Sequence, residues 1–428
     1  MKLLVKLFLI LSFCIISTTA FAATYTISGN VPNDIPAPAG RQIDNNGTLI
    51  DASVLNPNMG SYTFEVTPKE GSGQVYVSIP AAILAGLRLQ MPAFTVNIEA
   101  PFGIYRLPVD IVDRLTDEDI DEGILRSASF RVTLMDKSTD TALLDAFQKS
   151  LPHAKPISGF VDFKLELIHT SSNEIIMPVS DYLGIIERLL PVSVAQIPRY
   201  YGIFCYNEST QNFDFTPHSL ATYNDKPYVE FKIGGATIHV AAENDVPFND
   251  VPATAWYASQ VSQAASKALV RGVGNNSYQP SREVTRAEFA QMITNALLLP
   301  QAGGAPYEDV VYSQWFYNAI ARCKAHGLLY QFTEKNFYPN RHLTREEMAT
   351  ILAAVLRDCE ITSSAALGQF QDSVSMTTAY MPDIALVFGT GLMQGVAQDK
   401  FDPKGVTTRA QAATVLIRLL ETLNMIDK

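Results

Sequence analysis

The sequence contains little cysteine, little histidine and no excess of positive charge. Only four cysteines and six histidines occur in 428 residues, which excludes a disulfide-rich secreted scaffold and leaves little material for imidazole-based metal sites. The formal net charge of -11 argues against non-specific binding to nucleic acid or to anionic membrane surfaces. A hydrophobic content of 47% indicates folded cores, and the length leaves room for roughly two to four domains.

A short apolar run, residues 7–16, follows Lys2 and Lys6 and precedes the small-x-small sequence Ala20-Phe21-Ala22. This is the pattern of a secretory signal peptide, and we expect residues 1–23 to be removed. The run is shorter than the roughly 20 apolar residues that a membrane-spanning helix needs, and no later stretch reaches that length. The sequence therefore predicts a secreted protein without a transmembrane anchor.

A threefold internal repeat fills the C-terminal part of the chain. Each copy begins with an aromatic-x-Asp element, and its aspartates are 59 and 63 residues apart: Asp250, Asp309 and Asp372. Trp256 and Trp315, the two tryptophans of the chain, follow the first two aspartates at the same distance, and Tyr380 lies near the equivalent place in the third copy. Each copy continues with a helical pattern that ends at glycine, an aromatic-x-Pro element and a second helical pattern.

The second helix of each copy opens with a capping box, in which a threonine is followed three residues later by Glu or Gln. The three pairs are Thr285 with Glu288, Thr344 with Glu347, and Thr408 with Gln411. An apolar stripe at helical spacing follows each box. Because a helix-loop-helix unit cannot bury its own apolar stripe, we expect the three units to pack together.

An arginine occupies the first helical position after each of these threonines, as Arg286, Arg345 and Arg409. A cation there is unfavourable by roughly 0.3–1 kcal/mol, because it lies beside the positive end of the helix dipole. One interpretation is an ion pair with the aspartates that begin the repeats. The other is an anion site, formed by the guanidinium and the free amides of the helix start. Recurrence of the arginine in all three copies favours the anion site.

Trp256 and Trp315 also allow two interpretations. Each lies early in a predicted helix, where an indole ring is often part of a core. Each could equally present a ring face to a sugar, and the sequence does not separate these alternatives.

This series of motifs resembles the S-layer homology (SLH) domain, present three times over residues 246–300, 305–362 and 368–425. The resemblance implies an all-α bundle in which three helix-loop-helix repeats are arranged with pseudo-threefold symmetry. It also implies non-covalent attachment to secondary cell-wall polysaccharide or a peptidoglycan-linked glycan, which often carries pyruvate ketals. The expected location is the cell wall or S-layer at the cell surface of a bacterium, where such proteins also self-associate.

The resemblance assigns the sugar contact to the arginine of each Thr-Arg-Ala-Glu motif, hence to Arg286, Arg345 and, less closely matched, Arg409. With the alternatives above, the candidate polysaccharide-binding residues are these arginines together with Asp250, Asp309, Asp372, Trp256 and Trp315. The third copy departs from the family pattern, since Gln411 replaces Glu and Tyr380 replaces Trp. Whether the third groove binds therefore stays open.

Residues 24–243 differ in character, with short β-rich runs punctuated by proline and glycine. We expect one or two β-sandwich-like modules, divided into 24–150 and 151–243 near Leu151-Pro152-His153. Strands that end in proline and lead into an apolar turn recur at Pro80, Pro108 and Pro178.

No motif of a known catalytic site appears in this region, and no cofactor or metal is predicted. Asp117, Asp119 and Asp121 imitate the start of a calcium loop, but Glu122 stands where the turn needs glycine. The favoured hypothesis is therefore a non-enzymatic cell-surface protein held by its SLH repeats. The alternative is an exported polysaccharide-active hydrolase that uses the repeats as an anchor, with its catalytic carboxylates in the N-terminal region.

Overall fold

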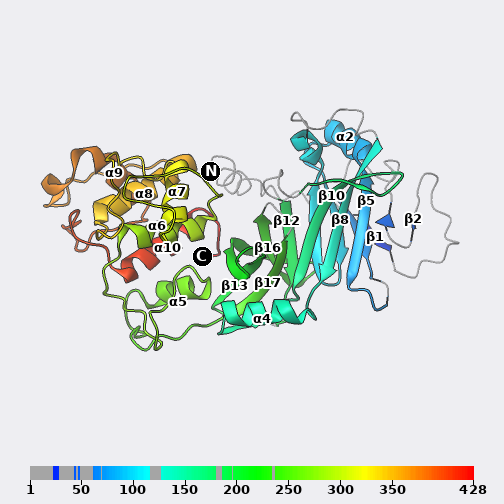
Figure 1. Ribbon diagram of the computed structural model, residues 1–428, viewed down its shortest axis with the longest axis horizontal. Coiled ribbons are helices and arrows are strands. Elements are labelled where there is room, and N and C mark those ends of the chain that lie inside the picture. Colours follow the sequence, from blue (N-terminus) through cyan, green and yellow to red (C-terminus); the bar gives the residue numbers. More distant parts are fainter. Residues whose placement is uncertain are drawn as a thin grey trace. The chain divides into compact units, whose positions relative to one another are not determined.

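The computed structural model describes residues 23–27, 43–44, 47–48, 61–68, 70–115, 127–179, 186–194, 196–233 and 237–428. The described residues divide into two compact units, one rich in strands that ends at Glu243 and one rich in helices that begins at Asn244 (Figure 1). The expected signal peptide, apart from Ala23, and the acidic segment at residues 117–122 lie outside the described residues.

The N-terminal unit contains a seven-stranded sheet in the order β1-β4-β6-β7-β12-β16-β15. The two pairs formed by β4 with β1 and β6 are parallel, and the remaining pairs in this sheet are antiparallel. Its strands are β1 (Ala23–Ile27), β4 (Ser61–Val66), β6 (Thr95–Ala100), β7 (Gly103–Pro108), β12 (Ile186–Pro191), β15 (His218–Tyr223) and β16 (Lys226–Ile233).

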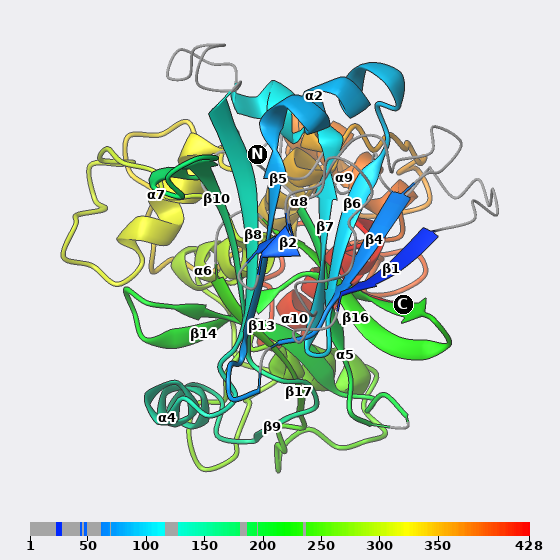
Figure 2. The same cartoon turned by 90° about the vertical axis from the view of Figure 1, so that its right-hand side faces the viewer.

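An eight-stranded sheet has the order β14-β13-β17-β10-β8-β5, with β11 added to β10 and β9 to β17. Its strands are β5 (Gln74–Pro80), β8 (Ala128–Asp136), β9 (Ala154–Pro156), β10 (Val161–His169), β11 (Ile175–Pro178), β13 (Tyr201–Asn207), β14 (Asn212–Thr216) and β17 (Thr237–Asn244). A separate hairpin joins β2 (Ile43–Asp44) to β3 (Gly47–Thr48). Helices α2 (Ala81–Gln90) and α4 (Thr141–Ser150) lie at opposite ends of the sheets (Figures 1 and 2).

The two sheets share one hydrophobic core, so this unit is a single β-sandwich-like module. Ile98 and Leu190 of the seven-stranded sheet pack in the same buried cluster as Phe130 and Phe163 of the eight-stranded sheet. The structure has no module boundary near residue 151, where the sequence predicted one. Strands β8 and β10 lie on either side of that position and pair in register from Ala128 with His169 to Asp136 with Val161. The segment at 151–153 only ends α4 and turns the chain into β9.

The C-terminal unit consists of three helix pairs. Their bounds are α5 (Ala258–Ser266) with α6 (Arg286–Leu297), α7 (Tyr317–Ala325) with α8 (Arg345–Asp358), and α9 (Met381–Gly389) with α10 (Arg409–Thr422). The second helix of each pair packs against the first helix of the next: α6 on α7, α8 on α9, and α10 on α5. This cyclic order closes the bundle and confirms the expected fold class.

Two general properties apply to the part of the chain that the structure describes. None of its helices has both the length and the apolar character needed to cross a bilayer. The described residues also contain no group of three or more His, Cys, Asp or Glu side chains that could hold a metal ion.

Candidate functional site

The three predicted capping boxes are present at the starts of α6, α8 and α10. Thr285 accepts a hydrogen bond from the Glu288 amide at 3.2 Å, and the Glu288 carboxylate accepts one from the Thr285 amide at 2.9 Å. Thr344 with Glu347, and Thr408 with Gln411, repeat the same reciprocal bonds. Glutamine can replace glutamate at the third helical position because the box needs only an acceptor oxygen there.

The next repeat in the ring takes up the first two amides of each second helix. At α6, the Arg286 amide donates to the Arg341 carbonyl and the Ala287 amide to the Pro339 carbonyl, both at 2.9 Å. The equivalent bonds run from Arg345 to Gly405 and Glu346 to Pro403, and from Arg409 to Arg282 and Ala410 to Pro280. The first two amides of each second helix are therefore not free to bind an anion, contrary to the sequence-based expectation, because they already donate hydrogen bonds to the next repeat.

The arginine side chains make the same kind of inter-repeat contact. Arg345 donates to the carbonyls of Phe401 at 2.9 Å and Gln394 at 2.7 Å, and its guanidinium lies 4.9 Å from the centroid of the Phe401 ring. Arg409 bonds the Tyr278 and Arg271 carbonyls of the first repeat, and Arg286 bonds the Phe337 carbonyl of the second. Each arginine thus fastens its own repeat to the aromatic-x-Pro loop of the next.

The aspartates that begin the repeats do not pair with these arginines. Asp250 instead accepts hydrogen bonds from the amides of Tyr278 at 2.8 Å and Gln279 at 2.7 Å, and from the Ser277 hydroxyl. Burial acts to raise the pKa of Asp250, but these hydrogen bonds outweigh it and leave the pKa below its ordinary value. Asp309 and Asp372 hold the loops of their own repeats in the same way.

These aspartates stabilise an unusual backbone turn. The middle residue of each aromatic-x-Pro element has a positive φ, of 57° at Gln279, 54° at Tyr338 and 62° at Asp402. A left-handed conformation is costly for residues other than glycine. Two charge-assisted bonds to one carboxylate offset that cost.

The two tryptophans are surface residues. Trp256 is 64% exposed and Trp315 is 61% exposed, whereas Tyr380 in the third copy is partly buried. Exposed indole rings of this size offer a flat apolar face to a ligand. Neither tryptophan is therefore a core residue, which was one of the two interpretations that the sequence allowed.

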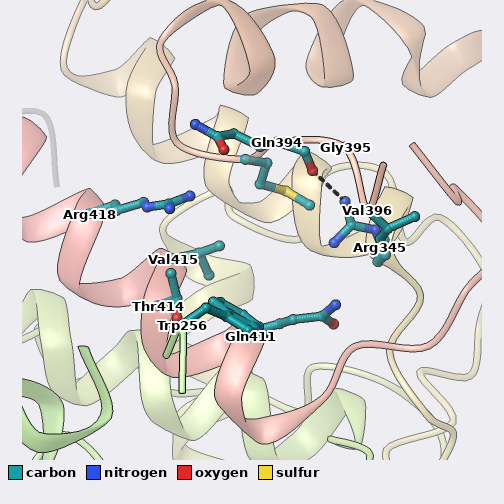
Figure 3. A pocket seen from close by; sticks show the side chains of 10 residues that line it. Trp256, Arg345, Gln394, Gly395, Val396, Gln411, Thr414, Val415 and Arg418 are labelled. Atoms are coloured by element: carbon teal, nitrogen blue, oxygen red, sulfur yellow. Dashed lines mark hydrogen bonds between the residues drawn. The ribbon is translucent and has the colours of Figure 1, made fainter. Parts of the chain in front are cut away.

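A pocket of about 380 Å³ brings together residues from all three repeats (Figure 3). One face of α10 contributes Gln411, Thr414, Val415 and Arg418, which follow helical spacing. Arg345 at the start of α8, Trp256 before α5 and residues 393–396 complete the wall. In Figure 3, Arg345 and Arg418 lie on opposite sides, with Gln394 and Gly395 above and Trp256 and Gln411 below.

The pocket therefore unites two of the predicted residues, Arg345 and Trp256, and leaves the others elsewhere. Arg418 and the loop at residues 393–396 are not among the residues predicted from the sequence. Arg418 could have been found by comparing the exposed faces of the second helices. Counted from the capping threonine, Arg418 is equivalent to Ala354 in α8 and Asn295 in α6.

The family model of the S-layer homology domain matches residues 247–290, 306–349 and 369–413, inside the three spans expected from the repeats. The chain carries three S-layer homology domains. Its relatives include the amylopullulanase of Thermoanaerobacterium thermosulfurigenes, 28% identical over 55% of this chain and 13% of that protein. The exoglucanase XynX of Acetivibrio thermocellus is 32% identical over 42% of this chain and 17% of that protein.

The surface-layer 125 kDa protein of Lysinibacillus sphaericus is 27% identical over 46% of this chain and 18% of that protein. The chain thus spans about a fifth or less of the length of these three relatives. The SLH domains, with the likeness to surface-layer proteins, identify an SLH-domain-containing protein of the cell wall and surface.

Proposed function

We propose that this chain is a non-enzymatic surface-layer-associated protein that is held non-covalently to an acidic cell-wall polysaccharide. The observation that carries the proposal is the pocket beside α10, which Arg345 and the exposed Trp256 both line. An aromatic face suits the apolar side of a sugar ring, and a guanidinium suits a carboxylate. A volume of about 380 Å³ lies within the range of small-molecule sites.

The other candidate residues have supporting roles in this proposal. Arg286 and Arg409 join neighbouring repeats, and the three aspartates fix the loops that carry the carbonyls accepting from the arginines. Trp315 is exposed like Trp256 and offers a second ring face to a long polymer. Binding to the wall then needs a correctly closed ring of three repeats, because one pocket draws on all of them.

A second candidate function is hydrolysis of a polysaccharide by the N-terminal sandwich. The named activities of the amylopullulanase and the exoglucanase make this worth testing, although the matches to them are partial. In the sandwich, Glu65 and Glu99 are direct neighbours on β4 and β6. Burial raises the pKa of Glu99, and the charge of Glu65 adds to the effect, which is the behaviour of a general acid. Release of reducing ends from wall polysaccharide by the full chain, lost in Glu99→Gln, would establish this function.

The anchoring proposal is tested by sedimentation of the full chain with cell-wall sacculi, before and after chemical removal of their polysaccharide. We expect binding only to the untreated sacculi. Trp256→Ala should weaken it about tenfold, which corresponds to a loss of about 1.4 kcal/mol of ring contact. Tyr312→Ala, at a ring that is 81% exposed but outside this pocket, is the matched control. Equal binding to stripped sacculi would refute the proposal.

A further inference from the structure

The outer face of the seven-stranded sheet carries a group of oxygen-bearing side chains on β4 and β6. Thr63 lies opposite Asn97, and Glu65 lies opposite Glu99, in the register of these two parallel strands. Side chains alternate between the two faces of a strand. Ile98, which lies between Asn97 and Glu99, belongs to the core shared by the two sheets. The four oxygen-bearing side chains therefore lie on the face that is turned away from that core.

Tyr223, at the end of β15, covers this group of side chains. In the strand order β15 lies four places from β6, which would be about 19 Å in a flat sheet. Tyr223 is nevertheless hydrogen-bonded to Glu99 and Thr63. It also packs against the buried cluster that contains Ile104 of β7. The sheet therefore curls until Tyr223 reaches β4 and β6, where Thr63 is fully buried and Asn97 is only 5% exposed.

Two buried oxygens of this group have no hydrogen-bond donor among the described residues. They are Oδ1 of Asn97 and Oε2 of Glu99. The Nδ2 atom of Asn97 donates to Thr63 at 3.2 Å, so only one end of this amide is used. Buried acceptors without a donor are rare in folded proteins, and a bound ion is one explanation for them. Side chains two residues apart on a strand share a face, so one small ion can contact both oxygens.

The charges on this face leave an excess of negative charge beside Asn97. Further along the face, two cations and two acids neutralise one another, in ion pairs of Arg106 and Lys232 with Glu187 and Glu230. Glu99 takes part in none of the ion pairs found among the described residues. The charge of Lys226 acts on Glu99, but Lys226 is exposed, so salt screens its charge. The neighbouring carboxylates of Glu65 and Glu99 thus lack a buried cation.

We infer that Glu65, Asn97 and Glu99 bind a divalent cation, and that this cation is Ca²⁺. Carboxylate and amide oxygens are the ligands of hard cations, and the set contains no imidazole or thiolate. Ca²⁺ accepts six to eight oxygens in flexible geometry, whereas Mg²⁺ demands a near-ideal octahedron. Hydroxyl groups and water complete the coordination. With two acids the site differs from clusters of three or more His, Cys, Asp or Glu side chains, which the described residues lack.

A cation at this position is incompatible with the catalytic role considered above for Glu99. A general acid must carry a proton at the working pH, whereas a bound cation keeps the carboxylate ionised. The ion also offsets the repulsion between Glu99 and Glu65 on neighbouring strands. Ca²⁺ binding and acid catalysis by Glu99 are therefore separable by experiment.

Equilibrium dialysis of the chelator-treated full chain against radioactive Ca²⁺, at neutral pH and about 0.15 M salt, tests the inference. We expect a dissociation constant between about 10⁻⁴ and 10⁻³ M, the range of extracellular calcium modules. Glu99→Gln should abolish binding at this site and so lower the number of ions bound per chain. Glu174→Gln removes the same charge from an exposed residue of the same unit. It is the matched control and should bind Ca²⁺ as the wild type does.

Asn97→Asp tests the site in the opposite direction, because affinity for Ca²⁺ rises with the number of charged ligands. It should tighten binding severalfold, a gain that misfolding cannot produce, and Asn97→Ala should weaken it. Circular dichroism confirms that each variant is folded. Equal binding by the wild type and Glu99→Gln, or no binding by the wild type in the stated range, would overturn the inference. Release of reducing ends by the Ca²⁺-saturated chain, lost in Glu99→Gln, would assign Glu99 to catalysis and overturn it as well.

Discussion

Replacing Glu347 by alanine should destabilise the SLH unit far more than the same change at Glu288. Both residues occupy the third position of a capping box, and both accept from the amide of their capping threonine, at 3.1 Å and 2.9 Å. The partners of their other bonds differ. Glu347 pairs with buried Arg286, whereas Glu288 is 25% exposed and pairs with Arg282, which is 38% exposed.

The difference in burial determines the expected magnitudes. Removing one partner of a buried ion pair costs about 3–5 kcal/mol, because the other charge is left buried without compensation. An exposed pair contributes about 0–1 kcal/mol. Loss of the bond to the threonine amide adds about 1 kcal/mol to both variants. Glu347→Ala should therefore lower the free energy of unfolding by about 3 kcal/mol more than Glu288→Ala.

Urea unfolding of the full chain, followed by tryptophan fluorescence, measures this difference, since both tryptophans lie in the SLH unit. Raising the salt concentration should erase the small ion-pair contribution at Glu288, which is screened, and leave the larger one at Glu347. Equal destabilisation by the two variants would refute the claim that a buried ion pair joins the first two repeats at Arg286.

Two further predictions concern the same unit. A Cβ atom on Gly395 would lie 2.5 Å from the Ala397 carbonyl oxygen and 2.8 Å from the Lys400 carbonyl oxygen. Gly395→Ala should therefore lower the calorimetric unfolding temperature. Gly303→Ala is the control and should leave that temperature unchanged, because a Cβ atom on Gly303 would have no atom within 4 Å. Burial lowers the pKa of Lys267 from its ordinary 10.5 to about 8, against the opposing charges of Asp427 and Glu421. Between these values the unfolded chain binds more protons than the folded one, so stability should rise with pH over that window. Lys267→Met should remove that rise, and an unchanged pH profile in urea unfolding would contradict it.

Local patterns predicted local structure well in this chain. The capping boxes depend on residues only three positions apart, and all three form as expected. Proline at a strand end behaves in the same way: Pro80 ends β5 and occupies the N-cap position of α2, and Pro108 ends β7 before the 3-10 helix Val109–Leu115. In each case the deciding interaction lies within one turn or one strand end.

Contacts between distant residues could not be predicted from such patterns. Strand pairing between β8 and β10 merges the two expected N-terminal modules into one, although nothing in either strand specifies its partner. The partners of the aspartates were equally hidden, because Asp250 bonds amides 28 and 29 residues later. The pairing of strands and loops that are distant in sequence depends on how the whole core packs. A pattern of residues along the chain does not specify that packing.

The recurrence of arginine at an unfavourable helix position has a structural cause that does not involve a ligand. A ring closed by three similar joints needs the same side chain at each joint, and Arg286, Arg345 and Arg409 supply it by donating to carbonyls of the next repeat. Positions that repeat are therefore explained by closure of the bundle. Gln411 and Arg418 break the repetition, and closure requires neither of them: glutamate satisfies the cap in α6 and α8, and asparagine or alanine serves in place of Arg418. Departures from internal symmetry thus indicate the pocket that we propose for the polysaccharide better than the repeated motif does.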